Sequence, residues 1–359
     1  MVLEWYGATS EVSWLFLLAA WVLALIFGSG AYAVWNRSGL RLRLEVLRSR
    51  PAADSPANEL PEQLIRVSPV ASPVFERDGL DLSVGLRTTG AARGPAWVRG
   101  EVGGTEIRFG TGLVPTSGWS RVQPLSDLHR GPVGASLWRI GTSDPLGFFR
   151  GQRACPDTEV ALVLPRFASL AGRREPRELE ASTASPRGGY GNEVFGVREY
   201  RAGDSLRRIH WRSSARRGEL VVREYEPPGL QTLTILVDPD PPSLPVADQI
   251  ARLAASEAWD CIREGGRVAI GGPGMEPVGP SRDLWSLLDW LARYPQPAST
   301  DLAAGSPAGG QEVVVIAAGA NPQLIEEGER ARRRRGWMVG GAAVVSDIPF
   351  TAVGTEWPL

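Results

Sequence analysis

Residues 233–270, LTILVDPDPPSLPVADQIARLAASEAWDCIREGGRVAI, decide the fold of the second half of the chain. Residues 233–238 form a continuous apolar run that ends in an acid, which is typical of a buried strand. Residues 250–262 carry apolar side chains at helical spacing, interrupted by Glu257. Residues 267–271 predict a second strand. A strand, a helix and a strand in this order predict a parallel sheet covered by helices.

The pattern continues toward the C-terminus. Ser281 is placed to cap a second helix over residues 284–291, and residues 312–318 predict a third strand. Residues 338–345 predict a fourth strand. The arginine run at residues 332–335 is expected at a solvated helix end, where positive charge suits the helix dipole. Residues 231–359 are therefore predicted to form an α/β domain.

Upstream lies an arginine-rich stretch, residues 188–228, GGYGNEVFGVREYRAGDSLRRIHWRSSARRGELVVREYEPP. It contains eight arginines in a chain whose formal net charge is −1. Guanidinium groups interleaved with aromatic rings are suited to gripping a partner's carboxylates, so the stretch is a candidate recognition surface. The predicted partner-binding residues are Arg198, Arg201, Arg207, Arg208, His210, Trp211, Arg212, Arg216 and Arg217.

This stretch resembles the bacterial family catalogued as domain of unknown function 58 (DUF58). The resemblance rests on Arg198-Glu199-Tyr200, Gly203-Asp204, Ile209-His210-Trp211 and the alternating residues 220–225, which follow in that order. It implies a membrane-tethered protein with a von Willebrand factor A-like (Rossmann-type) domain, associated with a MoxR-type AAA+ ATPase. It implies no established catalytic reaction. Members of the family often carry two membrane helices, whereas this chain has room for one.

The resemblance also places a metal site after the first strand of the α/β domain. Von Willebrand A-like domains read Asp-x-Ser-x-Ser there and hold a divalent cation through oxygen ligands. Here Asp238 matches the first ligand, Asp240 replaces the first serine, and Pro242 offers no ligand atom. We expect a degenerate cation site at best and no other cofactor.

Two other functions remain open. A hydrolase could use His210 with Asp204 and one of the serines Ser205, Ser213 or Ser214, or a cation at Asp238. No nucleophile-elbow motif surrounds these serines, so a non-enzymatic role is preferred. A membrane-tethered nucleic-acid binder would use the same arginines, but the near-neutral net charge makes nucleic acid an improbable partner.

The N-terminal half predicts a membrane anchor and a β-domain. Residues 12–36 carry no charge and are long enough to span a bilayer once. Arg37, Arg41, Arg43 and Arg48 follow, which places the bulk of the chain in the cytoplasm by the positive-inside rule.

Short alternating runs over residues 61–155 then predict a β-sandwich. One of these runs is residues 64–67, and Asp144 is expected to open a turn after which Phe148 and Phe149 pack. The predicted divisions are 1–40 anchor, 41–60 linker, 61–155 β-sandwich, 156–230 family signature segment and 231–359 von Willebrand A-like domain.

Together these features predict a single-pass, membrane-anchored, non-enzymatic scaffold or adaptor. Its expected partners are the lipid bilayer and a MoxR-like AAA+ ATPase. Cys155 and Cys261 lie far apart in the sequence and predict neither a metal motif nor a disulfide framework.

Overall fold

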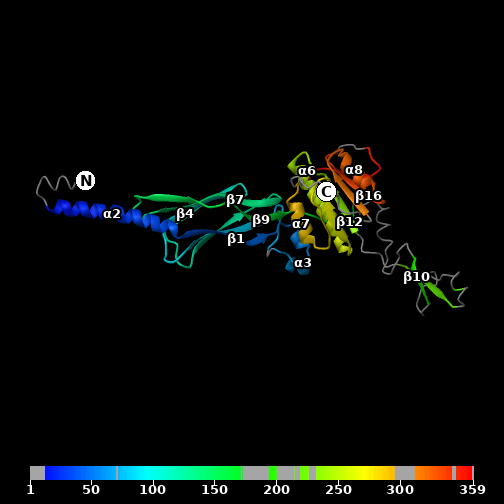
Figure 1. Cartoon of the computed structure of the whole chain (residues 1–359), viewed down its shortest axis with the longest axis horizontal. Helices are drawn as coiled ribbons and strands as arrows, with labels where there is room; N and C mark the ends of the chain where they lie inside the picture. Colours follow the sequence, from blue (N-terminus) through cyan, green and yellow to red (C-terminus); the bar gives the residue numbers. More distant parts are fainter. Residues whose placement is uncertain are drawn as a thin grey trace. The chain divides into compact units, whose positions relative to one another are not determined.

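The computed structural model describes residues 13–69, 72–170, 172, 194–199, 214, 219–225, 232–295, 312–341 and 345–357. The chain divides into two compact units, Met1–Leu164 and Pro165–Leu359 (Figure 1). Each unit contains its own hydrophobic core.

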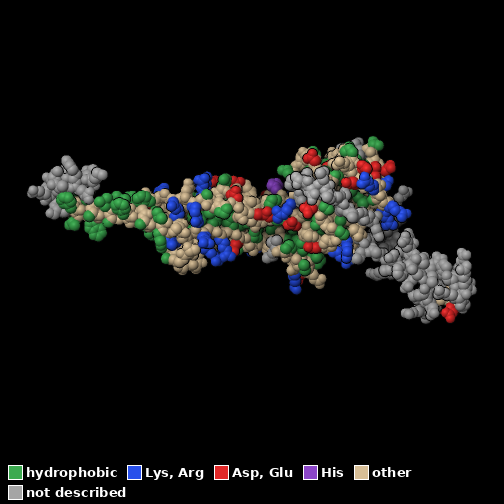
Figure 2. All heavy atoms as spheres, viewed as in Figure 1, with side chains coloured by type: hydrophobic (Ala, Val, Ile, Leu, Met, Phe, Trp, Pro, Cys, Tyr) green, Lys and Arg blue, Asp and Glu red, His purple; other side chains and the backbone are tan. Residues whose placement is uncertain are grey.

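The first unit begins with a long apolar helix, α2 (Ser13–Ser38). From Trp14 to Ser38 this helix is long and apolar enough to cross a membrane. Large apolar side chains such as Trp14, Trp21 and Phe27 are exposed. Figure 2 shows hydrophobic side chains along the visible face of this helix. The apolar helix predicted near the N-terminus is therefore present.

The C-terminal half of α2 docks on the strands of the same unit through polar side chains. The Ser29 hydroxyl donates to the Asp144 carboxylate, and the Tyr32 hydroxyl donates to the carbonyl of Gly94. Asn36 is fully buried: its amide nitrogen lies 3.2 Å from the carbonyl oxygen of Pro95, and its amide oxygen accepts from the Gly94 N–H at 3.0 Å. These bonds fix the helix against the unit.

Arg93, in the connection between β3 and β4, contacts the C-terminal end of α2. The Arg93 guanidinium lies over the ring of Trp35, 3.4 Å from its centroid, and donates to the Trp35 carbonyl at 2.6 Å. A cation at this position satisfies an orphan carbonyl and suits the negative end of the helix dipole. A Cβ on Gly39 would lie 2.6 Å from the Arg93 guanidinium, so a larger residue there would displace this arginine.

Two sheets share the core of this unit. One is three-stranded and antiparallel, in the order β1-β3-β6; the other has the order β2-β9-β7-β4-β5, with β8 paired to β7. Leu82, Val98 and Ile140 represent both sheets in one cluster of buried side chains. The strands are β1 (Leu40–Arg50), β2 (Val74–Phe75), β3 (Gly79–Thr88), β4 (Ala96–Val102), β5 (Thr105–Thr111), β6 (Trp119–Leu125), β7 (Gly131–Ser143), β8 (Arg150–Ala154) and β9 (Thr158–Leu164).

Three expectations for this half were wrong. The first part of the predicted 41–60 linker is strand β1, whose alternating leucines and arginines pair with β3; only a short 3-10 turn, η1 (Pro56–Asn58), follows. Residues 64–67 were predicted as a strand, but residues 64–66 belong to helix α3 (Glu62–Arg66) and residue 67 follows it. Leu64 and Ile65 are adjacent apolar residues, so the run does not alternate as a strand would. Strand β9 pairs with β7, although it was assigned to the 156–230 signature segment.

The second unit is built on a six-stranded sheet in the order β14-β13-β12-β15-β16-β17. All neighbours pair in parallel except β13 with β14. The strands are β12 (Thr232–Val237), β13 (Arg267–Gly271), β14 (Val278–Ser281), β15 (Glu312–Ala317), β16 (Arg333–Val339) and β17 (Phe350–Val353). The helices are α6 (Leu244–Arg263), α7 (Leu284–Ala292) and α8 (Pro322–Glu329).

Strand register places helices on both faces of this sheet. Leu236 pairs with Val315, and both lie in one cluster with Leu324 of α8. Because successive side chains of a strand point to opposite faces, the residues between them face the other way, toward α6. Trp337 of β16 is one of these, and it contacts α6 through Glu257.

Two expectations for this half were also wrong. The arginine run at residues 332–335 leads into strand β16 rather than ending a helix, so the fourth strand begins five residues before the predicted 338–345. Asp283, not Ser281, caps α7: its carboxylate accepts from the N–H of Trp285. Ser281 ends strand β14.

Candidate functional site

The carboxyl edge of the six-stranded sheet holds the predicted metal position. Asp238 follows β12 and is buried. One of its carboxylate oxygens accepts from the N–H of Asp240 at 3.3 Å, and the other accepts from the N–H of Ala318 at 3.1 Å. The Tyr294 hydroxyl donates to the Asp238 carbonyl. Asp238 therefore connects the loops that follow β12 and β15 and the residues that follow α7.

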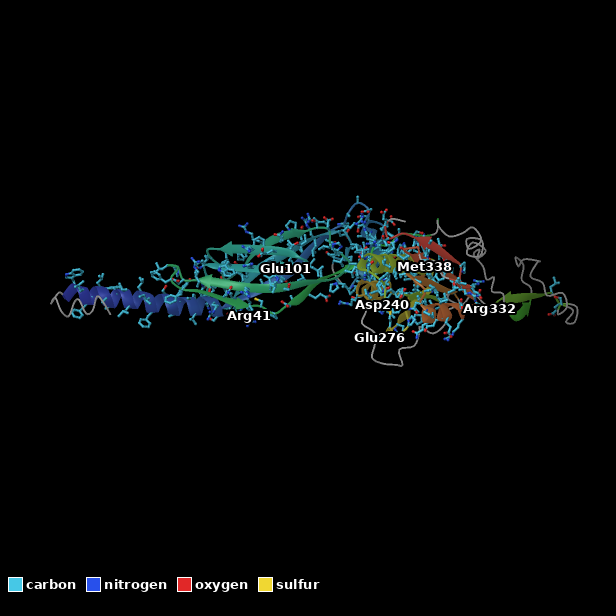
Figure 3. All side chains as sticks on the ribbon, turned by 90° about the horizontal axis from the view of Figure 1, so that it is seen from above. Arg41, Glu101, Asp240, Glu276, Arg332 and Met338 are labelled. Carbon is cyan, nitrogen blue, oxygen red and sulfur yellow. The ribbon has the colours of Figure 1, made fainter. Side chains whose placement is uncertain are left out.

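These residues do not fit the cation site that the resemblance implies. Asp240 is exposed, and Pro242 has no side-chain oxygen. Within the described ranges, no group of three His, Cys, Asp or Glu side chains is placed to hold a metal ion. Figure 3 labels Asp240 and Glu276 at the loops after β12 and β13, and Arg332 at the opposite edge of the sheet. In this structure Asp238 links the loops after β12 and β15 through its hydrogen bonds.

Within the described residues of this unit, a buried ion pair joins α6 to β16. The Glu257 carboxylate is fully buried. It accepts hydrogen bonds from both terminal nitrogens of Arg335, one of them at 2.8 Å. Trp337 Nε1 donates to the same carboxylate at 2.7 Å, and Arg335 Nε reaches Glu312 at 3.0 Å. Burial alone would lower the pKa of Arg335. The charge and hydrogen bonds of Glu257 have a larger effect in the opposite direction, so the pKa of Arg335 is raised. Glu257 interrupts the apolar stripe of α6 because it meets this arginine.

Another face of α6 holds an extended segment at the start of the unit. The Ala168 N–H donates to Ser256 Oγ at 3.2 Å, and the Leu170 N–H donates to Asp260 Oδ2 at 2.9 Å. The ring of Phe167 packs on Trp259, with centroids 5.4 Å apart. Because Ser256 and Asp260 are buried, their oxygens replace water as acceptors for this backbone.

The arginine-rich stretch is described only in part. Arg198 lies in strand β10 (Val194–Glu199), opposite Val222 of β11 (Val221–Tyr225). Among the strands that the structure describes, these two pair only with each other. The other predicted partner-binding residues lie outside the described residues: Arg201, Arg207, Arg208, His210, Trp211, Arg212, Arg216 and Arg217.

The catalytic alternative falls mostly outside the described residues as well. Asp204, His210, Ser205 and Ser213 are among those not described. Ser214 is described and is buried. The Ser-His-Asp arrangement therefore stays a prediction.

Sequence reasoning missed the polar side chains that dock α2. Ser29, Tyr32 and Asn36 are spaced three and four residues apart, which puts them on one helical face. Three hydrogen-bonding residues on one face of an otherwise apolar helix are a readable signal that this face meets protein. The Glu257–Arg335 pair was also missed, although an acid within an apolar stripe marks it in the same way.

One family model matches the middle of the chain. The family model described as protein of unknown function DUF58 matches residues 196–272. These residues contain most of β10 and all of β11, β12, α6 and β13. The matches support the DUF58 family. The DUF58 range thus includes Asp238 and Glu257, and it begins within the arginine-rich stretch.

A distant relative agrees with this assignment. The chain is 22% identical over 166 residues to "Uncharacterized protein YeaD" of Bacillus subtilis (strain 168), over 45% of this chain and 40% of YeaD. The match therefore spans less than half of that relative. Among solved structures, the CARDB domain of the PF1109 protein from Pyrococcus furiosus, in complex with di-metal ions, matches 34% of this chain and 96% of that domain. Its identity of 15% and TM-score of 0.17 carry no argument about fold or metal.

Proposed function

We propose that this protein is a single-pass, membrane-anchored, non-enzymatic adaptor that partners a MoxR-type AAA+ ATPase. The observation that carries the proposal is helix α2. It exposes large apolar side chains over its first half and is fixed to the β-strands by buried polar contacts over its second half. An exposed apolar helix is stable in lipid, because lipid tails solvate its side chains.

The charges after the helix set the proposed orientation. Arg37, Arg41, Arg43 and Arg48 follow the apolar run, whereas Glu4 and Glu11 precede it. Arginines near one end of a span favour the cytoplasmic side of the membrane. The two units are therefore assigned to the cytoplasm, where an ATPase would meet them.

The domain classes implied by the resemblance belong to this proposal. Two sheets around one core are the arrangement of a β-sandwich. A largely parallel sheet with helices on both faces is the architecture of von Willebrand A-like domains. At the family's metal position, Asp238 already accepts two backbone N–H groups, and this agrees with an adaptor that works without the cation.

The arginine-rich stretch is the proposed ATPase contact. A guanidinium group can bind a carboxylate with two parallel hydrogen bonds and stack on aromatic rings. Residues 188–228 provide eight of these groups. The described strands β10 and β11 would present part of the stretch as an antiparallel pair of strands.

Capture experiments with the full-length protein test this proposal. The tagged protein in detergent would be mixed with a purified MoxR-type ATPase from the same source. We expect Arg207→Ala/Arg208→Ala and Arg216→Ala/Arg217→Ala to lose capture while melting temperature is unchanged. A recognition surface requires these arginines to be exposed, and exposed charges contribute about 0–1 kcal/mol each. The control Arg87→Ala/Arg121→Ala removes two exposed arginines from the first unit and should retain capture.

Three outcomes would overturn the proposal. The first is equal capture by all variants. The second is a lower melting temperature in the arginine variants, which would mean that these side chains hold the fold together. The third is a steeply salt-dependent affinity for oligonucleotides that falls in the same variants, which would instead favour a nucleic-acid binder.

A further inference from the structure

The loop between β7 and β8 exposes three large apolar side chains. Leu146, Phe148 and Phe149 are 55%, 61% and 38% exposed. The sequence predicted that the two phenylalanines pack after the turn; Phe149 lies near Gly30 of α2, but both rings keep a large exposed area. Apolar side chains grouped in one short loop mark a contact surface more often than scattered ones do.

This loop lies beside the apolar helix. The Asp144 carboxylate in the loop accepts from the Ser29 hydroxyl, and the ring of Phe149 is 3.8 Å from where a Cβ on Gly30 would be. Figure 1 shows the β7–β8 end of the sheet, in green, running alongside α2. Ser29 is nine residues before the end of α2 at Ser38. At about 1.5 Å per residue, the loop reaches back roughly 14 Å along the helix.

That reach leaves a short stretch of described helix ahead of the loop contact. The part of α2 before the loop contact, from Ser13 to Gly28, has 16 residues. It rises about 24 Å, whereas the hydrocarbon core of a bilayer is about 30 Å thick. Any tilt of the helix increases the shortfall. The charged Glu11 limits how far the apolar run extends on the other side.

We propose that the β7–β8 loop inserts Leu146, Phe148 and Phe149 into the lipid bilayer beside α2. This inference rests on the proposed membrane anchorage. The shortfall of about 6 Å falls within the depth of roughly 5–10 Å to which apolar groups of interfacial elements are buried. The loop thus becomes a second membrane contact that sets the height of the first unit at the membrane surface.

The polar groups of the loop are arranged for this position. The Asp144 carboxylate accepts from the N–H groups of Leu146, at 3.0 Å, and Phe149, at 2.6 Å, so its charge is satisfied inside the loop. Arg150 directly follows the apolar tip and is exposed. Arg37 lies against Gly151, 2.8 Å from where a Cβ would be. Arginines at this level suit the phosphates of lipid headgroups, while the apolar tip enters the acyl region.

Fluorescence quenching in vesicles tests the inference on the full-length protein. In a Cys155→Ala/Cys261→Ala background, Phe148→Cys would carry an environment-sensitive label. Leu137→Cys is the matched control, because Leu137 is 70% exposed on the same strand β7. It lies six residues from Ser143, or about 20 Å along the strand from the α2 contact. Val22→Cys, in α2, reports on the helix itself.

The vesicles would contain phosphatidylcholine and phosphatidylglycerol, with spin-labelled lipid as one quencher and aqueous iodide as the other. We expect the label at 148 to be quenched by lipid several-fold more than the label at 137, and to be protected from iodide. Iodide quenching at 148 equal to that at 137, with lipid quenching at 22, would overturn the loop insertion and leave the anchor intact.

Three further results bear on the inference. Lipid quenching at both 148 and 137 would overturn a specific role of the loop, because the whole unit would then lie on the membrane. The absence of lipid quenching at 22 would overturn the proposed anchor and the loop insertion with it. Protection of 148 from iodide without lipid quenching would assign the loop to a protein partner or a second copy, and would also overturn the inference.

Discussion

Helices α2 and α6 are both long and interrupted by polar residues, but they are covered differently. Most side chains of α6 from Val246 to Cys261 are buried by the protein itself. The first half of α2 exposes many large apolar side chains, although Leu15 and Ala19 are buried, and its second half is docked on the strands through polar side chains. Apolar content alone therefore does not distinguish a helix for a protein core from a helix for a membrane.

The positions of the polar residues distinguish a helix packed in a protein core from a helix exposed to lipid. On α6, Glu257 meets Arg335 of β16. On α2, Ser29 and Asn36 meet the ends of the strands, whereas the apolar run from Trp14 to Phe27 contains no polar residue. A buried polar side chain needs a specific partner, so it marks the part of each helix that contacts protein.

Breaking the Glu257–Arg335 pair should have the largest effect. Glu257→Ala leaves Arg335 buried without its main partner and removes the acceptor for Trp337. Loss of one member of a buried pair destabilises a fold by about 3–5 kcal/mol. Chemical denaturation of the second unit within the full chain measures this loss.

The control for this prediction is an exposed pair in the same unit. Glu326 and Arg330 are ion-paired on α8 and both are exposed. Glu326→Ala should cost about 0–1 kcal/mol. Equal effects of the two substitutions would show that burial of the α6 pair does not matter.

A charge within the apolar half of α2 should release the protein from the membrane. Leu23→Arg raises the free energy of membrane insertion by about 3 kcal/mol. We expect a larger share of the protein in the soluble fraction after cell lysis and a carbonate wash. The equivalent change on α6, Leu253→Arg at a buried position, should lower thermal stability without changing this distribution. Opposite behaviour of the two variants would contradict the assignment of α2 to lipid.

Removing Asn36 should loosen the docked half of α2. Asn36→Ala leaves the N–H of Gly94 and the carbonyls of Pro95 and Ser143 without this partner. Unsatisfied buried groups cost about 1–3 kcal/mol. Amide hydrogen exchange around Gly94 should become faster. Ser38→Ala, which removes an exposed hydroxyl from the same helix, should leave exchange unchanged.

The smallest effect is expected from pH. Burial opposes ionisation of Asp144, but the hydrogen bonds from Ser29, Phe149 and Leu146 outweigh it and lower its pKa from 3.8 to about 2. A carboxyl group with a lowered pKa stabilises the fold above its unfolded pKa, and this contribution is lost as pH falls from about 4 toward 2. Melting temperature in detergent should therefore fall less steeply over this window in Asp144→Asn than in the unchanged protein.

Glu106 provides the matched control for the pH measurement. A hydrogen bond from Arg108 lowers the pKa of Glu106, but this carboxyl is exposed. Glu106→Gln should leave the acid dependence of melting almost unchanged, because solvent screens exposed pairs. An effect as large as that of Asp144→Asn would contradict the role given to the buried contact.

The sequence predicted those elements whose pattern is local. The apolar helix near the N-terminus, the strand at residues 233–238 and helix α6 were all visible from periodicity or length. Strand β1 was missed although Leu40–Val46 alternates, because it follows the span after one residue and was taken for a linker. An extended strand this close to the helix is stable only through its pairing with β3, which is a long-range contact.

Side-chain partners were harder to predict than elements. Arg335 was assigned to a solvated helix end because four consecutive arginines are usually exposed. In the structure it is a largely buried strand residue opposite Val314, and its partner Glu257 lies 78 residues away in the chain. Asp238 was correctly placed after a buried strand, but its contact with the N–H of Ala318 depends on how β12 and β15 align. Such contacts follow from the assembled sheet and not from local sequence.

The most direct test of the account is the topology of α2. Reporter fusions at each end of the full-length chain, one active only in the cytoplasm and one active only outside it, measure which side each end occupies. The account predicts that the C-terminal fusion is active only with the cytoplasmic reporter and that the N-terminal fusion is active only with the external one. Activity of the external reporter at the C-terminus would contradict both the orientation and the proposed ATPase partner.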